Sequence, residues 1–240
     1  MKQSIFSIGL RLGLLAVFLK SLTALGQMPD AGVNSAMIKL FGENAAFTAQ
    51  AEVRVLNSNR VVWLQMPGVF AAADTKLRVD VDMNLIRSSA ITPAMIKQLG
   101  LDRITSVIRP DKRATYIIYP GKKTFVSMPL SAADAQIAGQ RLEKKPLGNE
   151  TIDGHACVKN VSTVKTAKGT VLLQATTWNA ADLKEFPVQI EIKEGGNISV
   201  LHFQNINLTK PNTVLFDVPA GFRDETNLQN NNKPPAAKKK

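Results

Sequence analysis

The chain has 240 residues, of which 45% are hydrophobic and 20% charged, a composition that fits one globular domain with a sizeable core. The net charge is +11, but acidic residues are interspersed with most of the basic ones, so the charge pattern does not favour a nucleic-acid partner. Cys157 is the only cysteine, which excludes an internal disulfide, and its strand-like neighbours predict a small buried residue.

The N-terminal segment has the three parts of a secretory signal peptide. Lys2 and Arg11 precede an apolar run over residues 12–19, and small residues follow up to Gly26. We expect cleavage after Gly26, so that residues 1–26 are a leader. The mature protein is then exported to the periplasm or cell envelope of a Gram-negative-type bacterium and does not span a membrane. The alternative is an uncleaved anchor, because Lys20 directly follows the run.

The remaining sequence predicts a single domain over residues 27–226 and a basic tail over residues 227–240. The tail has no apolar periodicity, which is typical of a disordered segment. Its last residues, Lys238, Lys239 and Lys240, offer a contact with an anionic membrane surface. A tail that only increases solubility is the alternative.

Three short helices are predicted. Asp30 caps the first, whose apolar face begins at Val33 with spacing i, i+4, i+7 and i+8, and Gly42 ends it. The second occupies residues 93–99, with a threonine cap, a proline at its first position and a glycine after its end. A weaker third helix is predicted from Ser131 to about Arg141.

Alternating apolar and polar residues predict strands in the rest of the domain. The expected strands are residues 47–56, 61–71, 77–83, 104–109, 114–119, 124–128, 150–166, 170–178, 187–193, 197–208 and 214–218. In the tenth of these segments the alternation slips by one position, which predicts a bulge near Asn205. The fold class is therefore mainly β with α, in the α+β class.

No residue pattern points to catalysis or to a metal. His155 and His202 are the only histidines, and His155 with Cys157 provides too few ligands for a metal site. The two histidines fall on one predicted face, so a metal shared with distant carboxylates stays open as an alternative. The sequence has no G-x-S-x-G elbow and no phosphate-binding glycine loop. We expect no cofactor and no enzymatic activity.

Large, adaptable apolar side chains are spread over the strands and the middle helix. A strongly curved sheet of about ten strands encloses more space than its side chains fill, so these residues are candidates to line a cavity for an apolar ligand. The candidates are Trp63, Met66, Phe70, Met83, Met95, Trp178 and Phe203. Core packing is the alternative for each of them.

Four segments share their order and spacing with one family. They are Tyr116-x2-Tyr119-Pro120, the run from Gly148 to Cys157, Trp178-x3-Asp182-Leu183-x2-Phe186-Pro187, and the ending over residues 216–222. In these segments the chain resembles the DUF4412-type bacterial exported proteins, which are related to the lipoprotein-carrier fold of the LolA and LppX kind. The resemblance implies a single, strongly curved antiparallel sheet, or open half-barrel, with helices covering its concave side. It also implies a hydrophobic cavity for acyl chains, and it supplies no catalytic residue.

Together these observations lead us to expect a non-enzymatic periplasmic protein that binds a lipid or the acyl chain of a lipoprotein, as a carrier or a chaperone-like protein. Its partners would be a lipid or an acylated protein. The alternative is an envelope protein-interaction or sensor module without bound lipid. An enzyme is a third hypothesis, which would need polar groups gathered around His155 or His202 in a pocket.

Overall fold

The computed structural model describes residues 33–42, 44, 46–88, 92–130 and 137–226. The predicted leader (1–26), the helix cap Asp30 and the basic tail (227–240) lie outside the described residues. Within the described ranges, no helix combines the length and the apolar character needed to cross a bilayer.

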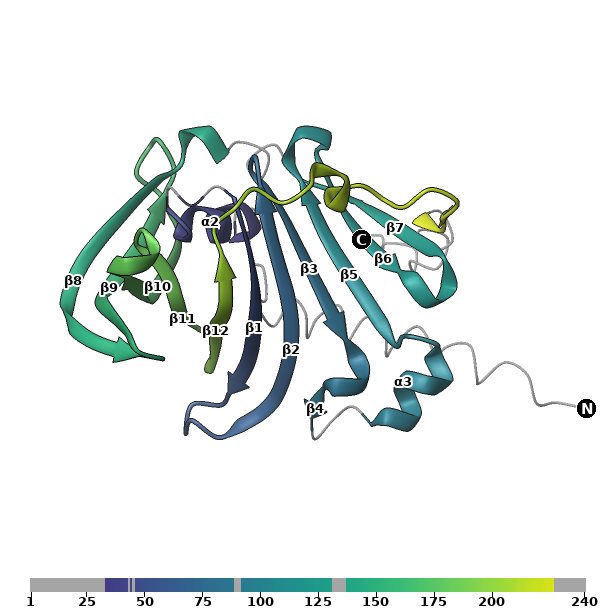
Figure 1. The fold of residues 1–240 in the computed structure, drawn as a ribbon, viewed down its shortest axis with the longest axis horizontal. Helices are drawn as coiled ribbons and strands as arrows, with labels where there is room; N and C mark the ends of the chain where they lie inside the picture. Colours follow the sequence, from purple (N-terminus) through teal and green to yellow (C-terminus); the bar gives the residue numbers. More distant parts are fainter. Residues whose placement is uncertain (1–32, 43, 45, 89–91, 131–136, 227–240) are drawn as a thin grey trace, which may run out of the picture.

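In the part of the chain that the structure describes, thirteen strands form one sheet, which makes up the body of the molecule (Figure 1). They are β1 (Phe47–Leu56), β2 (Val62–Ala73), β3 (Lys76–Asp82), β4 (Arg87–Ser88), β5 (Arg103–Arg109), β6 (Ala114–Tyr119), β7 (Thr124–Pro129), β8 (Arg141–Ile152), β9 (His155–Lys165), β10 (Val171–Ala180), β11 (Phe186–Glu194), β12 (Asn197–Asn207) and β13 (Arg223–Asp224).

The strands are arranged in the order β13-β7-β6-β5-β3-β2-β1-β12-β11-β10-β9-β8, and the short β4 pairs with β2. All pairs are antiparallel except that of β13 with β7. The described sheet does not close on itself, because β13 and β8 stand at its two ends. This agrees with the expected open, mainly antiparallel architecture, although about ten strands had been expected.

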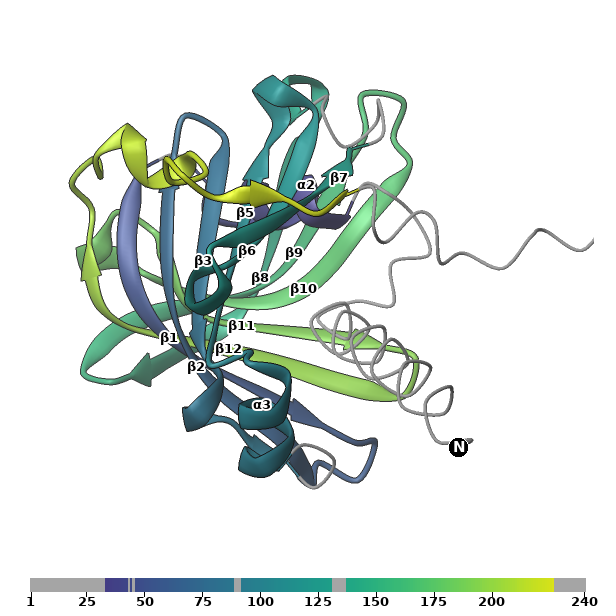
Figure 2. The same ribbon diagram turned by 90° about the vertical axis from the view of Figure 1, so that its right-hand side faces the viewer.

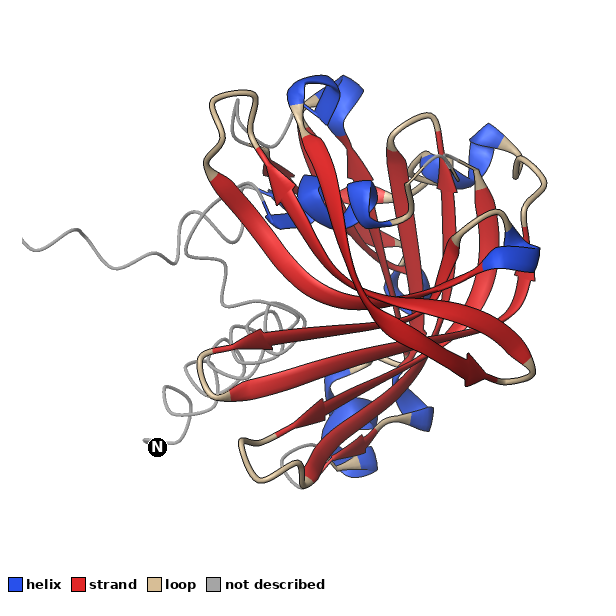
Figure 3. Ribbon diagram, turned by 90° about the vertical axis from the view of Figure 1, so that its left-hand side faces the viewer, coloured by secondary structure: helices blue, strands red, loops and turns tan. Residues whose placement is uncertain are grey.

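Most of the short helices lie at the ends of strands, whereas α2 lies across the sheet (Figure 3). Among the described residues, the α-helices are α2 (Val33–Leu40) and α3 (Pro93–Leu99), and the 3-10 helices are η2 (Met83–Leu85), η3 (Pro110–Lys112), η4 (Pro120–Lys122), η5 (Ile137–Gly139), η6 (Ala181–Leu183) and η7 (Thr213–Phe216). The first two predicted helices are confirmed. In α3 the Thr92 side chain caps Met95, and Gly100 ends the helix with φ 60°.

The third predicted helix is wrong in its described part. Residues Ile137–Gly139 form only a single 3-10 turn, and Arg141 already belongs to β8, where it pairs with Lys165. Backbone pairing along the whole of β9 outweighs the weak helical signal of this segment.

Two strand predictions are also wrong. The segment 150–166 is not one strand, because Asp153 (φ 49°) and Gly154 (φ 84°) form the turn between β8 and β9. The segment 214–218 is not a strand, because most of it belongs to the 3-10 helix η7. The Asn212 side chain caps this helix by accepting a hydrogen bond from the Val214 N–H. The predicted bulge at Asn205 is confirmed, since this residue has φ 50° and lies where the β1–β12 register shifts.

The sheet has an inner face, which carries α2, and an outer face. Ala36, Leu40 and Phe41 of the α2 region pack into one continuous apolar core on the inner face, which extends from β9 to β7. Figure 2 shows the sheet curving around α2. Strand alternation places Phe47, Ala49, Ala51 and Val53 of β1 on this face, where all are buried.

Aromatic rings fill the centre of the inner face. Phe41, Phe47, Phe186 and Phe203 lie with ring centroids 4.6 to 5.6 Å apart, and Phe70 meets Phe203 edge-on at 5.3 Å. All five rings are at most 2% exposed. This part of the concave side is therefore packed with side chains rather than hollow.

The C-terminal segment, residues 209–226, crosses the outer face and is called the strap here (Figure 1, yellow-green). Phe216 of the strap is fully buried in a second, small core with Ala71, Ala73, Val107 and Ile118. Arginines from β3 and β5 hold its backbone, since Arg78 donates to the Leu215 carbonyl (2.7 Å) and Arg109 donates to that of Phe216 (2.9 Å).

Candidate functional site

The seven residues predicted to line a cavity fall into different environments. Met66, Phe70, Met83 and Phe203 are at most 3% exposed and belong to the main core, while Trp63 and Met95 are half-buried. Trp178 lies beside charged groups: its Nε1 donates to Glu150 Oε2 at 2.6 Å, and Lys159 Nζ lies 4.9 Å from the ring centroid. A ligand-lining role for these seven residues stays a prediction.

The apolar inner face continues over β3, β5, β6 and β7, beyond the aromatic centre. Ile104, Ile117 and Val126 are buried there, whereas Val79 and Met128 are only half-buried. The main contacts of α2 are with β8, β9, β10 and η5, and those of α3 are with η2. Within the described part of the chain, neither helix packs mainly on this region, which we call the apolar half.

Two buried hydroxyl groups in the apolar half lack a hydrogen-bond partner. Thr115 of β6 is 6% exposed and Thr124 of β7 is 2% exposed, and neither Oγ1 has a partner in the described structure. Thr115 lies directly opposite Met128 in the β6–β7 register. A buried hydroxyl without a partner costs about 1–3 kcal/mol.

A fully satisfied polar cluster lies between β9 and β10. Ser162 shares a hydrogen bond of 2.7 Å with Thr177, and Asn179 Oδ1 accepts from both Thr177 (2.7 Å) and Asn160 (3.1 Å). Asn179 also donates to the Glu185 carbonyl at 2.8 Å. These bonds fix the crossing from β10 to β11, so we assign the cluster a structural role.

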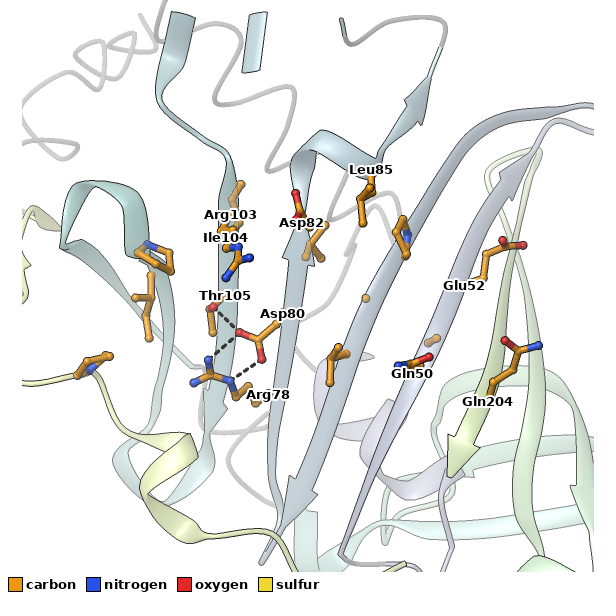
Figure 4. A pocket seen from close by; sticks show the side chains of 18 of the residues that line it. Gln50, Glu52, Arg78, Asp80, Asp82, Leu85, Arg103, Ile104, Thr105 and Gln204 are labelled. Atoms are coloured by element: carbon orange, nitrogen blue, oxygen red, sulfur yellow. Dashed lines mark hydrogen bonds and ion pairs between the residues drawn. The ribbon is translucent and has the colours of Figure 1, made fainter. Parts of the chain in front are cut away.

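The outer face contains a cleft of about 880 Å³, between the strands and the strap (Figure 4). Asp80 lies at its centre, where its carboxylate accepts two hydrogen bonds from Arg78 (2.6 and 2.7 Å) and one from the Thr105 hydroxyl (2.6 Å). None of the seven predicted lining residues lines this cleft. The sequence signal that marks it is the alternation of Arg78, Asp80 and Asp82 with apolar residues, which places three charged side chains on one face of β3.

The acidic side chains that line this cleft have hydrogen-bond partners. Glu52 accepts from Gln65 at 2.6 Å and Asp82 accepts from the Asn84 N–H at 3.0 Å, so these carboxylates, like Asp80, have partners. Val69 is 47% exposed and Leu85 is 58% exposed, and both line the cleft. The lining thus combines paired charges with exposed aliphatic side chains.

Both histidines pair with aspartates around a smaller pocket of about 540 Å³ near the β8–β9 turn. His155 Nδ1 is 2.7 Å from Asp182 Oδ2. His202 Nε2 is 2.9 Å from Asp153 Oδ2, which is close enough for an ion pair. The two groups do not have the geometry of a hydrogen bond. In the residues that the structure describes, no three histidine, cysteine, aspartate or glutamate side chains are grouped to hold a metal ion.

Cys157, close to this pocket, is buried as expected. Its Sγ donates to the His155 carbonyl at 3.4 Å, and burial raises the pKa of the thiol. A buried thiol with a raised pKa is a poor nucleophile at neutral pH, which fits a packing role.

No protein-family model matches the chain, and no curated protein matches it. Similar solved structures include a LolA superfamily protein from Nitrosomonas europaea, with 12% identity, a TM-score of 0.40 and coverage of 77% of this chain and 95% of that one. Lipoprotein LppX from Mycobacterium tuberculosis has 13% identity and a TM-score of 0.38, over 77% of this chain and 97% of that one.

A putative outer membrane lipoprotein-sorting protein domain from Vibrio parahaemolyticus has 11% identity and a TM-score of 0.40, over 78% of this chain and 97% of that one. These structure neighbours are of the LolA superfamily and lipoprotein-sorting kind, while the DUF4412 type itself has no matching model. At such low TM-scores the likenesses by themselves define neither a ligand nor an activity.

Proposed function

We propose that the protein is a non-enzymatic carrier of the periplasm or cell envelope, which binds an acyl chain of a lipid or lipoprotein on the apolar half of its inner face. The observation that carries the proposal is the partial exposure of Val79 and Met128 on an otherwise apolar surface. These side chains lie in an open sheet whose described helices pack mainly elsewhere.

Apolar burial supplies the binding energy for such a ligand. Each buried methylene contributes about 0.8 kcal/mol, so ten methylenes contribute roughly 8 kcal/mol before the entropic cost of association. This is enough for a useful affinity without any covalent or catalytic step. The Thr115 hydroxyl, buried and without a partner opposite Met128, would donate to a carbonyl oxygen of the ligand.

The first experiment measures binding of a fluorescent fatty acid to delipidated protein. Met128→Asp places a charge on the inner face and should weaken binding tenfold or more, since a buried unpaired carboxylate costs several kcal/mol. Val171→Asp, on an exposed position of β10 outside the apolar half, is the matched control and should bind normally. Absence of saturable binding, or equal affinities of the two variants, would contradict the proposal.

A second variant tests the hydroxyl. Thr115→Val keeps the shape of the side chain and removes a buried polar group that has no protein partner. We expect this variant to be as stable as the parent protein or more stable, and to bind a fatty acid several-fold more weakly. Unchanged affinity would show that Thr115 does not contact the ligand. Apolar burial would then be the one remaining source of the binding energy.

In the alternative function, an envelope interaction module, the edge strand β8 would bind a protein partner. This strand is twelve residues long, is mostly exposed, and has β9 as its one neighbour among the described strands. However, Pro146 removes a backbone donor in its middle, and the register shifts between Pro146 and Gly148. Proline and bulges are features that protect edges from pairing with another chain. An edge built in this way favours the carrier over the interaction module.

A further inference from the structure

One end of the molecule combines exposed aliphatic side chains with cations that lack acidic partners. It is formed by the β1–β2 turn, η2, β4 and α3, which lie together at the bottom of Figures 1 and 2, and by η4 beside them. We call it the basic end and define it by Val61, Val62, Leu85, Arg87, Lys97, Arg103, Lys122 and Lys123.

The elements of the basic end touch one another. β4 pairs with β2 at Leu64–Ser88 and Gln65–Arg87, close to the start of β2 at Val62. η2 contacts β2, β5 and α3. Lys122 lies against the C-terminus of α3, because a Cβ atom added at Gly100 would be 3.2 Å from its Cε. Residues from four separate parts of the chain thus share one surface.

Three aliphatic side chains of this end are unusually exposed. Val61 and Leu85 are each 58% exposed, and Val62 is 44% exposed. Single exposed aliphatic residues are common on proteins, but here they lie at the tip of a hairpin and on a neighbouring turn. Aliphatic side chains in such positions enter the boundary between headgroups and acyl chains when a protein lies on a bilayer.

The charges of this end are not neutralised. Arg87, Lys97, Arg103, Lys122 and Lys123 form no ion pair with a carboxylate in the described structure. The acidic groups nearby include Asp82, which accepts from Asn84, Asp102, which faces Gly121, and Glu191, which pairs with Arg60. None of these described carboxylates forms an ion pair with the five cations.

The opposite ends of β3 and β5 differ in this respect. There Arg109 pairs with Asp111 and Asp217, Lys112 also pairs with Asp217, and Lys210 pairs with Asp74. Five cations without a carboxylate partner and three exposed aliphatic side chains thus share one end of the described structure. We infer that the basic end docks on the surface of an anionic lipid bilayer. This inference rests on the proposed function, since a carrier of acyl chains must meet a membrane to load or release them.

The test is sedimentation of the full chain with phosphatidylcholine vesicles, prepared with and without phosphatidylglycerol, and without added fatty acid. The triple variant Lys97→Glu, Lys122→Glu, Lys123→Glu should lose on the order of 100-fold in its partition coefficient for the anionic vesicles, at about fivefold or more for each cation. All variants share the same N-terminal segment, so differences between them report on the described surface.

The matched control reverses three other exposed cations without ion pairs, Arg113, Lys168 and Lys184, which lie outside the basic end. It has the same net charge as the test variant and should bind nearly as well as the parent. Val61→Ser, Val62→Ser and Leu85→Ser together should weaken binding even at raised salt, where electrostatic attraction is screened.

Several results would overturn the inference. Equal losses in the two charge-reversal variants would show that only net charge matters, and loss on neutralising Lys238, Lys239 and Lys240 alone would assign docking to the tail. Binding to soluble polyglutamate as strong as to vesicles would indicate an acidic protein partner. Fatty-acid binding is measured separately: if it fails while docking persists, the carrier proposal falls and the docking surface stands.

Discussion

Arg109 of β5 and Phe216 of the strap are 107 positions apart in the chain and are joined by a hydrogen bond of 2.9 Å from Nη1 to the carbonyl oxygen. The same guanidinium donates to both oxygens of Asp111 at 2.8 and 2.7 Å, and to Asp217. The Phe216 side chain is fully buried beneath this contact. The strap is therefore an integral part of the fold.

The first prediction concerns this anchor. Phe216→Ala should lower the free energy of unfolding by about 3–5 kcal/mol, because it leaves a cavity between Ala71, Val107 and Ile118. Leu215→Ala is the control, since that side chain is 40% exposed and should change stability by less than about 1 kcal/mol. Urea denaturation measures both values, and similar losses would contradict a buried anchor.

The second prediction is a pH dependence. Hydrogen bonds from Arg109 lower the pKa of Asp111 from its ordinary value of 3.8 to about 2. A carboxyl group with a lowered pKa stabilises the fold above its unfolded pKa, and this stabilisation is lost as the pH falls from 3.8 to about 2. The pKa of Asp217 is lowered too, by Lys112 and Arg109.

Arg109→Gln should therefore cost about 1–3 kcal/mol at neutral pH, with the lower part of the range favoured because Asp111 is partly exposed to solvent. The difference in thermal stability between the parent and this variant should shrink as the pH falls from about 4 to about 2. Over this interval Asp111 becomes protonated in the folded protein and loses its ion pair with Arg109, because its pKa is lowered to about 2. A constant difference over this interval would show that the ion pairs do not contribute.

The third prediction uses Trp178 as a reporter. Hydrogen bonds from Lys159 and Trp178 lower the pKa of Glu150 below its ordinary value of 4.5. In a Trp63→Phe variant, which leaves Trp178 as the single tryptophan, the emission should change at a pH below 4.5, when Glu150 becomes protonated. Glu150→Gln should abolish this transition. A transition that survives the Gln substitution would have another cause.

How far the sequence predicts the fold depends on whether the signal is local. Thr92, Pro93 and Gly100 define α3 through their own backbone preferences, and the phase slip at Asn205 marks a real bulge. Both features were predictable because neighbouring residues determine them. The hairpin at Asp153–Gly154 had its turn signal, but the alternation on both sides resembled one long strand.

The errors and the candidate site have non-local causes. Val214 and Leu215 have strand-like character, yet Arg78 and Arg109 hold the strap in a 3-10 turn from distant strands. The outer cleft arises because the strap crosses residues from β1 to β6, which no local pattern reveals. Similarly, the apolar character of Trp178 does not reveal that Glu150 accepts from its Nε1 and that Lys159 lies over its ring, although the residue belongs to the main core.

The fourth prediction tests the bulge. Asn205 has φ 50°, a left-handed conformation that asparagine and glycine tolerate and β-branched residues do not. Asn205→Gly should retain stability within about 1 kcal/mol, whereas Asn205→Val should lose about 1–2 kcal/mol or more through backbone strain. Thermal unfolding of both variants decides the matter, and a valine variant as stable as the glycine variant would contradict the assigned geometry.

The central claim is that the inner face holds an acyl chain. Native mass spectrometry of protein purified from the cell envelope tests it most directly. The account predicts a species heavier than the polypeptide by the mass of an acyl-bearing molecule, which is removed by delipidation and restored by adding membrane lipid. A protein that stays at the mass of the polypeptide alone, both as purified and after incubation with membrane lipid, would contradict it.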